Sequence, residues 1–117
     1  MARQLAGVAA LARLDLLDRI ARFRSTDMAL RGYFSHIDPN GVTPFEVMRR
    51  MGARYGMASE IIAWNTTSGD AGPVAAVHGG LASIGHREAM LDERHRHAGI
   101  GVASDGGKRL YTIVFTD

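Results

Sequence analysis

The change of sequence period along the chain limits the possible folds more than any other feature. Across residues 6–32 the apolar side chains recur at helical spacing, which predicts one long helix with an interruption near Asp15. Residues 98–115 instead predict a β-hairpin, with Gly106-Gly107 supplying the positive φ that its turn requires. Because helices come early and strands come late, the sequence favours an α+β fold in which helices cover a mostly antiparallel sheet.

Three further segments complete the predicted elements. A second helix is expected from Pro44 to about Met51, with Thr43 as its N-cap and Glu46 closing a capping box. The apolar run 59–65 predicts a buried strand. An alanine-rich helix opening at Pro73 and running over residues 73–83 is expected next, and a short helix over 83–91 follows it.

The composition indicates one soluble globular domain spanning residues 1–117. The hydrophobic content is 46% and the charged content is 22%, which are ordinary values for such a domain. The chain has no cysteine, which excludes a disulfide framework, a thiolate zinc cluster and a cysteine nucleophile. Any chemistry must therefore come from histidine, carboxylate or hydroxyl groups.

The charge pattern and the apolar segments exclude two classes of partner. The net charge is only +2, and the basic residues are interleaved with acids, so we expect no nucleic-acid site. No segment approaches the length of apolar residues that a transmembrane helix needs. The first residues also lack a convincing cleavage site, so we expect no export signal within this chain.

Three residues stand out as candidates for a functional site. His36 lies between the first helix and an Asp-Pro-Asn-Gly turn, Glu60 lies on the predicted buried strand, and His86 follows a glycine. Two neutral histidines beside a carboxylate can hold a divalent ion such as zinc and leave a position open for water or a ligand. The spacing matches no local ligand motif, so the spacing alone favours ordinary structural histidines over a metal or catalytic site.

The other histidines are predicted to have no site role. His95 and His97 are flanked by Arg94 and Arg96, which disfavour a cation, so we expect solvated loop residues there. His78, beside two glycines, is predicted to lie on a helix surface. The aromatic residues predicted for the core are Phe34, Trp64 and Phe115, and those that could line a groove are Tyr33 and Tyr55.

Four ordered segments resemble the CAP superfamily of cysteine-rich secretory, antigen 5 and pathogenesis-related 1 proteins, and in particular its bacterial SCP-like branch. They are "DMALRGYFSHIDPNGVTPFEVMRRMG", "SEIIAW", "ASIGHREAML" and "GIGVASDGGKRLYTIVF". The resemblance implies a three-layer α-β-α sandwich with a groove that holds two histidines and acidic residues, and that binds zinc or similar ions in several members. Carried over by position, the histidines are His36 and His86, and the glutamate is Glu60.

The resemblance also implies a location and a boundary. Members of the family are commonly secreted or attached to the cell surface, so we expect the same of this domain. The chain enters the family pattern partway along its first helix, so any export signal is expected to lie upstream of Met1.

Three positions depart from the family pattern. Ser83 stands where animal and plant members have a second glutamate, Gly80 stands where they have a tryptophan, and Ile61 follows the strand glutamate in place of asparagine. The loss of one acid removes a group that would orient water or balance the charge of a metal.

Two functions therefore remain open at this point. The first is a noncatalytic extracellular module, a monomer or weak dimer, whose groove binds a divalent metal and a lipid, glycan or peptide ligand. The alternative is a hydrolase. In one version Glu60 orients a water on a metal held by His36 and His86. In the other, Ser83 is the nucleophile, His86 the base and Glu60 the orienting acid, although Ser83 could simply be an N-cap.

Overall fold

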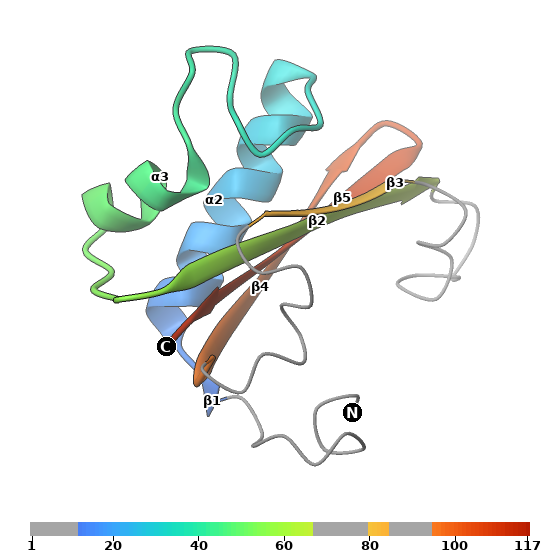
Figure 1. Ribbon diagram of the computed structural model, residues 1–117. Helices are drawn as coiled ribbons and strands as arrows, with labels where there is room; N and C mark the ends of the chain where they lie inside the picture. Colours follow the sequence, from blue (N-terminus) through green and yellow to red (C-terminus); the bar gives the residue numbers. More distant parts are fainter. Residues whose placement is uncertain (1–11, 67–79, 85–94) are drawn as a thin grey trace.

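The computed structural model describes residues 12–66, 80–84 and 95–117, and these residues form an α+β fold (Figure 1). With labels as in Figure 1, the helices are α2 (Asp15–Arg31) and α3 (Pro44–Arg50). The strands are β1 (Ala12–Arg13), β2 (Ala58–Thr66), β3 (Gly80–Ile84), β4 (His97–Asp105) and β5 (Lys108–Thr116). They form one sheet in the order β1-β4-β5-β2-β3. Only the pairing of β1 with β4 is parallel, which confirms the predicted α+β fold with a mostly antiparallel sheet.

Helices α2 and α3 cover one face of this sheet. Leu17 and Ile20 of α2, Val47 and Met48 of α3, and Val114 of β5 belong to one buried apolar cluster. The helices predicted for the second outer layer fall on residues 73–91. Within that range only 80–84 are described, so the rest of this expectation lies outside the described residues.

The first helix begins later than the sequence period predicts. Residues Ala12 and Arg13 pair with β4, and Leu14 is extended with φ −122° and ψ 131°, so the helix prediction is wrong for these three residues. Asp15 and Asp18 occupy the first turn, where a negative charge favours the positive end of the helix dipole. Gly32 ends the helix with φ +68°, a left-handed conformation that glycine adopts without a steric penalty.

Strand β3 replaces the predicted end of an alanine-rich helix. Gly80 to Ser83 pair antiparallel with β2, with Gly80 opposite Trp64 and Ser83 opposite Ile61. The helix prediction is wrong here because pairing with an adjacent strand outweighs a local preference that two glycines already weaken. Ser83 therefore does not act as a helix N-cap.

Two glycines of β4 allow α2 to lie directly on the sheet. A Cβ atom built at Gly99 would overlap the backbone of Leu17, and one built at Gly101 would overlap the backbone of Arg22. At the outer edge of β4 the amide of Ile100 donates a hydrogen bond of 2.9 Å to the Asp18 carboxylate. This close contact sets the distance between α2 and the sheet. It therefore also sets the position of the α2 side chains that face β2.

The hairpin of β4 and β5 confirms the prediction for residues 98–115. Asp105 pairs with Lys108, so Gly106 and Gly107 are its two loop residues. Gly106 alone has positive φ, at +59°, as the first loop residue of a type II′ turn does.

The opposite face of the sheet holds a residue that was expected in solvent. His95 is fully buried, stacks on Phe115 with ring centroids 5.3 Å apart, and shares a 3.1 Å hydrogen bond between its Nε2 and the Ser59 hydroxyl. The expectation that His95 is solvated was wrong because it relied on the neighbouring arginines. Successive residues of an extended segment face opposite sides, so Arg96 is exposed while His95 is buried. His97 belongs to β4 rather than to a loop.

The predicted core aromatics differ in burial. Phe115 is buried, whereas Phe34 and Trp64 are partly buried and pack against Met28 and Ile62. Neither α2 nor α3 has the length and apolar composition that crossing a membrane would require.

Candidate functional site

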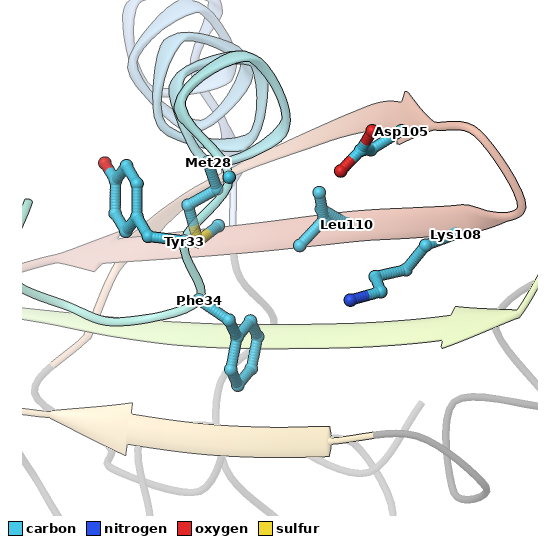
Figure 2. Close-up of a pocket in the computed structure, with 7 residues that line it drawn as sticks. Met28, Tyr33, Phe34, Asp105, Lys108 and Leu110 are labelled. Carbon is cyan, nitrogen blue, oxygen red and sulfur yellow. The ribbon is translucent and has the colours of Figure 1, made fainter.

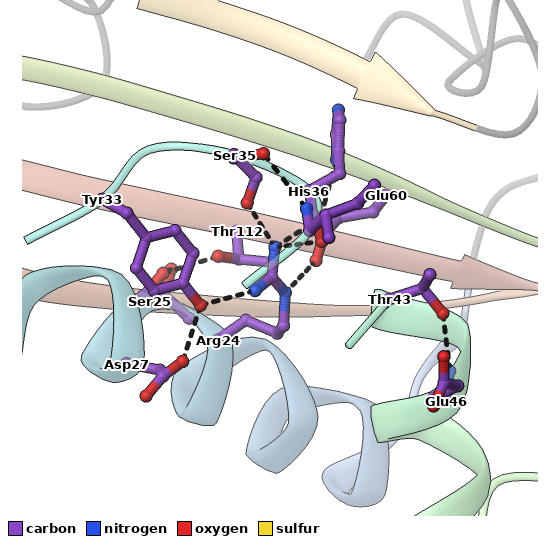
Figure 3. A network of polar contacts seen from close by, with 12 residues as sticks. Arg24, Ser25, Asp27, Tyr33, Ser35, His36, Thr43, Glu46, Glu60 and Thr112 are labelled. Carbon is purple, nitrogen blue, oxygen red and sulfur yellow. Dashed lines mark hydrogen bonds and ion pairs between the residues drawn. The ribbon is translucent and has the colours of Figure 1, made fainter. Parts of the chain in front are cut away.

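Two oppositely charged side chains form the centre of the site between α2 and β2. The side chains of Arg24 and Glu60 are 1% and 0% exposed. The guanidinium binds the carboxylate through two hydrogen bonds, from Nε to Oε2 at 2.7 Å and from Nη2 to Oε1 at 3.0 Å (Figure 3). A buried charge is tolerated only when it is paired and hydrogen-bonded, so each of these residues requires the other.

The remaining donors of Arg24 hold the segment that follows α2. Nη1 donates to the Tyr33 hydroxyl at 3.0 Å, and Nη2 also donates to the carbonyl oxygens of Ser35 and His36 at 2.8 and 3.1 Å. Burial alone lowers the pKa of Arg24, but the hydrogen bond and the negative charge of Glu60 outweigh it and raise that pKa above its usual value. Arg24 is therefore a permanent cation that ties the loop carrying His36 to the sheet.

His36 is held at one nitrogen and unpartnered at the other. Its Nδ1 lies 2.8 Å from Oε1 of Glu60. A carboxylate that accepts hydrogen bonds from Arg24 can only accept from His36 as well, so Nδ1 carries the proton. Nε2 is buried and has no hydrogen-bond partner within the described part of the chain, and in this tautomer it presents a lone pair.

The turn after His36 is as rigid as its sequence predicts. The Asp38 carboxylate accepts hydrogen bonds from the amides of Asn40 and Val42 at 2.8 and 2.9 Å, and Gly41 has φ +84°. The Thr43 hydroxyl then caps α3 by accepting from the amide of Glu46 at 3.2 Å, which confirms the predicted N-cap. His36 is thus fixed between Arg24 on one side and this turn on the other.

The structure brings together His36 and Glu60, two of the four predicted site residues. Ser83 lies in β3 opposite Ile61, whereas the register partner of Glu60 is Ile84. His86 lies outside the described residues. Of the two tyrosines expected near a groove, Tyr33 contacts the site through its hydroxyl, and Tyr55 instead donates to the carbonyl of Phe45 at 3.1 Å.

Sequence reasoning missed Arg24, although the helix pattern contained a signal for it. The apolar residues on the buried face of α2 are Leu17, Ile20, Ala21 and Met28, and position 24 falls on the same face. A charged residue in the middle of an apolar helical face requires a buried partner. Glu60 was already identified as a buried carboxylate in need of one.

The hydroxyl of Tyr33 should lose its proton at a higher pH than a free tyrosine does. The free energy of unfolding should therefore depend on pH under alkaline conditions. Burial, followed by the hydrogen bond that its hydroxyl donates to Asp27 at 2.6 Å, raises its pKa from 10.0 to about 12. The unfolded chain therefore loses this proton first, so the stabilisation is complete below pH 10 and is lost as the pH rises toward 12.

Urea unfolding at a series of alkaline pH values measures this effect. The Tyr33→Phe variant should lack the decline, and Tyr111→Phe, which leaves the contact with Asp27 intact, should retain it. An equal decline in the parent and in Tyr33→Phe would contradict the assignment.

Comparison with known proteins places the chain in a family. The family model described as the cysteine-rich secretory protein family, CAP, matches residues 1–116. The chain belongs to the CAP family. Its sequence is 34% identical over 104 residues to the protein YkwD of Bacillus subtilis, a match that covers 89% of this chain and 39% of YkwD.

Two solved structures share the fold. An extracellular SCP-domain protein from Bacillus anthracis aligns with a TM-score of 0.77 and 27% identity, over 98% of this chain and 36% of the other. An outer surface protein from Borrelia burgdorferi aligns with the same TM-score at 15% identity, over 99% of this chain and 84% of the other, and this likeness concerns the fold alone. This CAP-family chain thus spans well under half the length of YkwD and of the Bacillus anthracis protein.

The arrangement at His36 fits a metal ligand of the kind that CAP domains imply. Histidines that bind metals usually donate their second ring nitrogen to a carboxylate, which fixes the tautomer. Glu60 provides this contact, and Nε2 is the ring nitrogen that has no hydrogen-bond partner in the described part of the chain. Glu60 itself fits poorly as a ligand because Arg24 and His36 bind its oxygens. Within residues 12–66, 80–84 and 95–117 no group of three or more histidine or acidic residues could hold a metal, so a site with three protein ligands would need a residue outside these ranges, and the family resemblance predicts His86.

Proposed function

We propose that this CAP domain is a noncatalytic extracellular binding module. In this proposal its site holds a divalent ion such as zinc between His36 and His86 and leaves the remaining positions of the ion for a ligand. The observation that carries the proposal is the buried Nε2 of His36, which has no hydrogen-bond partner among the described residues and whose tautomer is set by Glu60. The extracellular location is supported by the Bacillus anthracis SCP-domain protein, which is an extracellular protein.

The state of Glu60 favours binding over hydrolysis. A carboxylate that activates water must have an oxygen free to accept a proton. Both oxygens of Glu60 accept hydrogen bonds from Arg24, and Oε1 also contacts His36. A lipid, glycan or peptide with an oxygen donor could complete the coordination of the ion without any bond being broken.

Zinc titration by calorimetry at neutral pH tests the metal site. We expect one saturable ion in the parent protein and a loss of affinity of about 100-fold or more in His36→Ala and His86→Ala, because removal of a direct ligand should cost at least as much as removal of its supporting partner.

The matched control for this titration is His97→Ala. In the described structure the ring of His97 makes one hydrogen bond, between its Nδ1 and the backbone oxygen of Asp117 at 3.2 Å. This variant should bind zinc like the parent. Equal binding by the parent and His36→Ala, with folding verified by circular dichroism, would exclude His36 as a ligand.

A further inference from the structure

A second candidate site lies at the end of the β4–β5 hairpin, away from His36. Here the end of α2 and the segment after it enclose a hollow of about 130 Å³. The residues around it are Met28, Gly32, Tyr33, Phe34, Asp105, Lys108 and Leu110 (Figure 2). Tyr33 contributes its ring, since its hydroxyl is bound to Asp27 and Arg24 on the other side. The hollow therefore has an apolar floor and one charged wall.

The charged wall carries both signs. Asp105 and Lys108 are opposite each other in the hairpin register, and their end groups point toward the space in front of Leu110 (Figure 2). They form no ion pair with each other, although both belong to the described residues. The Lys108 ammonium instead lies 4.7 Å from the centre of the Trp64 ring, a cation–π contact that holds it at the rim.

This combination fits one class of small molecule. We propose that the hollow binds a free apolar α-amino acid of about the size of leucine. Its carboxylate would pair with Lys108, its ammonium with Asp105, and its side chain would cover Met28, Phe34 and Leu110. An engineered apolar cavity of about 150 Å³ accepts benzene, so a hollow of this size is sufficient for a branched aliphatic group. Apolar sites with a few converging polar groups are the usual form of small-molecule pockets. The proposal goes beyond the metal site because it uses neither His36 nor Glu60.

The chain offers two unique reporters for this test. Lys108 is the only lysine and Trp64 the only tryptophan. Selective labelling with ¹³C-lysine therefore gives one side-chain signal from the proposed site, and the intrinsic fluorescence comes from the ring beneath it. Titration with L-leucine should shift both signals with one dissociation constant of about 1 mM, as expected for a ligand with so few atoms and solvent-accessible charges.

Analogues that lack one charge separate the zwitterion from simpler ligands. N-acetylleucine lacks the ammonium and leucinamide lacks the carboxylate, and each should bind about 10-fold more weakly than leucine. Lys108→Gln, followed by fluorescence, and Asp105→Asn, followed by both reporters, should lower leucine affinity by a similar factor. Arg109→Gln removes a neighbouring charge that does not line the hollow and should bind like the parent.

Two results would overturn the proposal. One is the absence of any saturable shift up to about 20 mM leucine, well above the expected dissociation constant. The other is binding of N-acetylleucine as tightly as leucine, which would remove the role of Asp105 and indicate a carboxylate-only ligand such as a peptide C-terminus.

Discussion

Replacement of Arg24 by methionine should lower the free energy of unfolding by about 3–5 kcal/mol, measured by urea denaturation at neutral pH. The substitution keeps much of the side-chain volume but leaves Glu60, which is 0% exposed, without its cation. It also removes the hydrogen bonds to the carbonyls of Ser35 and His36 that anchor the loop. The loss is large because an uncompensated buried charge costs far more than the pair contributes.

Two companion variants separate this cause from a general loss of packing. The double variant Arg24→Met/Glu60→Leu removes both charges and should recover most of the lost stability, because apolar replacement of a whole buried pair is often neutral. Arg50→Met breaks an exposed pair, in which Arg50 lies 3.5 Å from Glu46, and should change stability by no more than about 0.5 kcal/mol. If Arg24→Met were as mild as Arg50→Met, the buried pair could not be the centre of the site.

Gly101→Ala is the second substitution for which we expect a large effect. A methyl group at this position would overlap the backbone nitrogen of Arg22 and the carbonyl carbon of Ala21. Backbone atoms cannot rotate away as a side chain can, so α2 must move off the sheet. We expect a loss of about 3 kcal/mol in the free energy of unfolding, the upper part of the range for overpacking in a core.

Gly107→Ala is the matched control for this close contact. Gly107 lies on the same hairpin, has no positive φ, and a Cβ atom there would have no heavy atom within 4 Å. It should unfold within about 0.5 kcal/mol of the parent. Equal stability of the two alanine variants would show that α2 does not lie against β4 as described.

The displacement of α2 should also be visible at the site. Ser25, on the same helix, donates to the carbonyl of Gly101 at 3.1 Å and shares a 2.7 Å hydrogen bond with Thr112. Arg24 is the preceding residue, so a shift of α2 at Gly101 changes the Arg24–Glu60 geometry. Gly101→Ala should therefore weaken zinc binding together with stability, which a calorimetric titration of the folded fraction can measure.

Local sequence was sufficient for the elements whose signals are local. Thr43 and Pro44 mark the start of α3, Gly32 marks the end of α2, and the Gly106-Gly107 pair marks the hairpin turn, because capping and positive φ depend on residues that are adjacent in the chain. The same approach failed for residues 80–83. Their glycine and alanine content led to a helix prediction, whereas in the structure these residues form a strand that pairs with β2. Pairing between strands depends on a distant neighbour, which propensity cannot represent.

The sequence by itself determined that Glu60 is a buried carboxylate in need of a partner, that His36 precedes a rigid turn, and that the chemistry excludes thiols. Only the tertiary structure decided the identity of that partner. Arg24 is 36 residues from Glu60, and the two meet because Gly99 and Gly101 let α2 approach the sheet closely enough for a guanidinium to reach β2. No spacing rule links these positions, since the contact depends on how a helix packs on a sheet rather than on any local pattern.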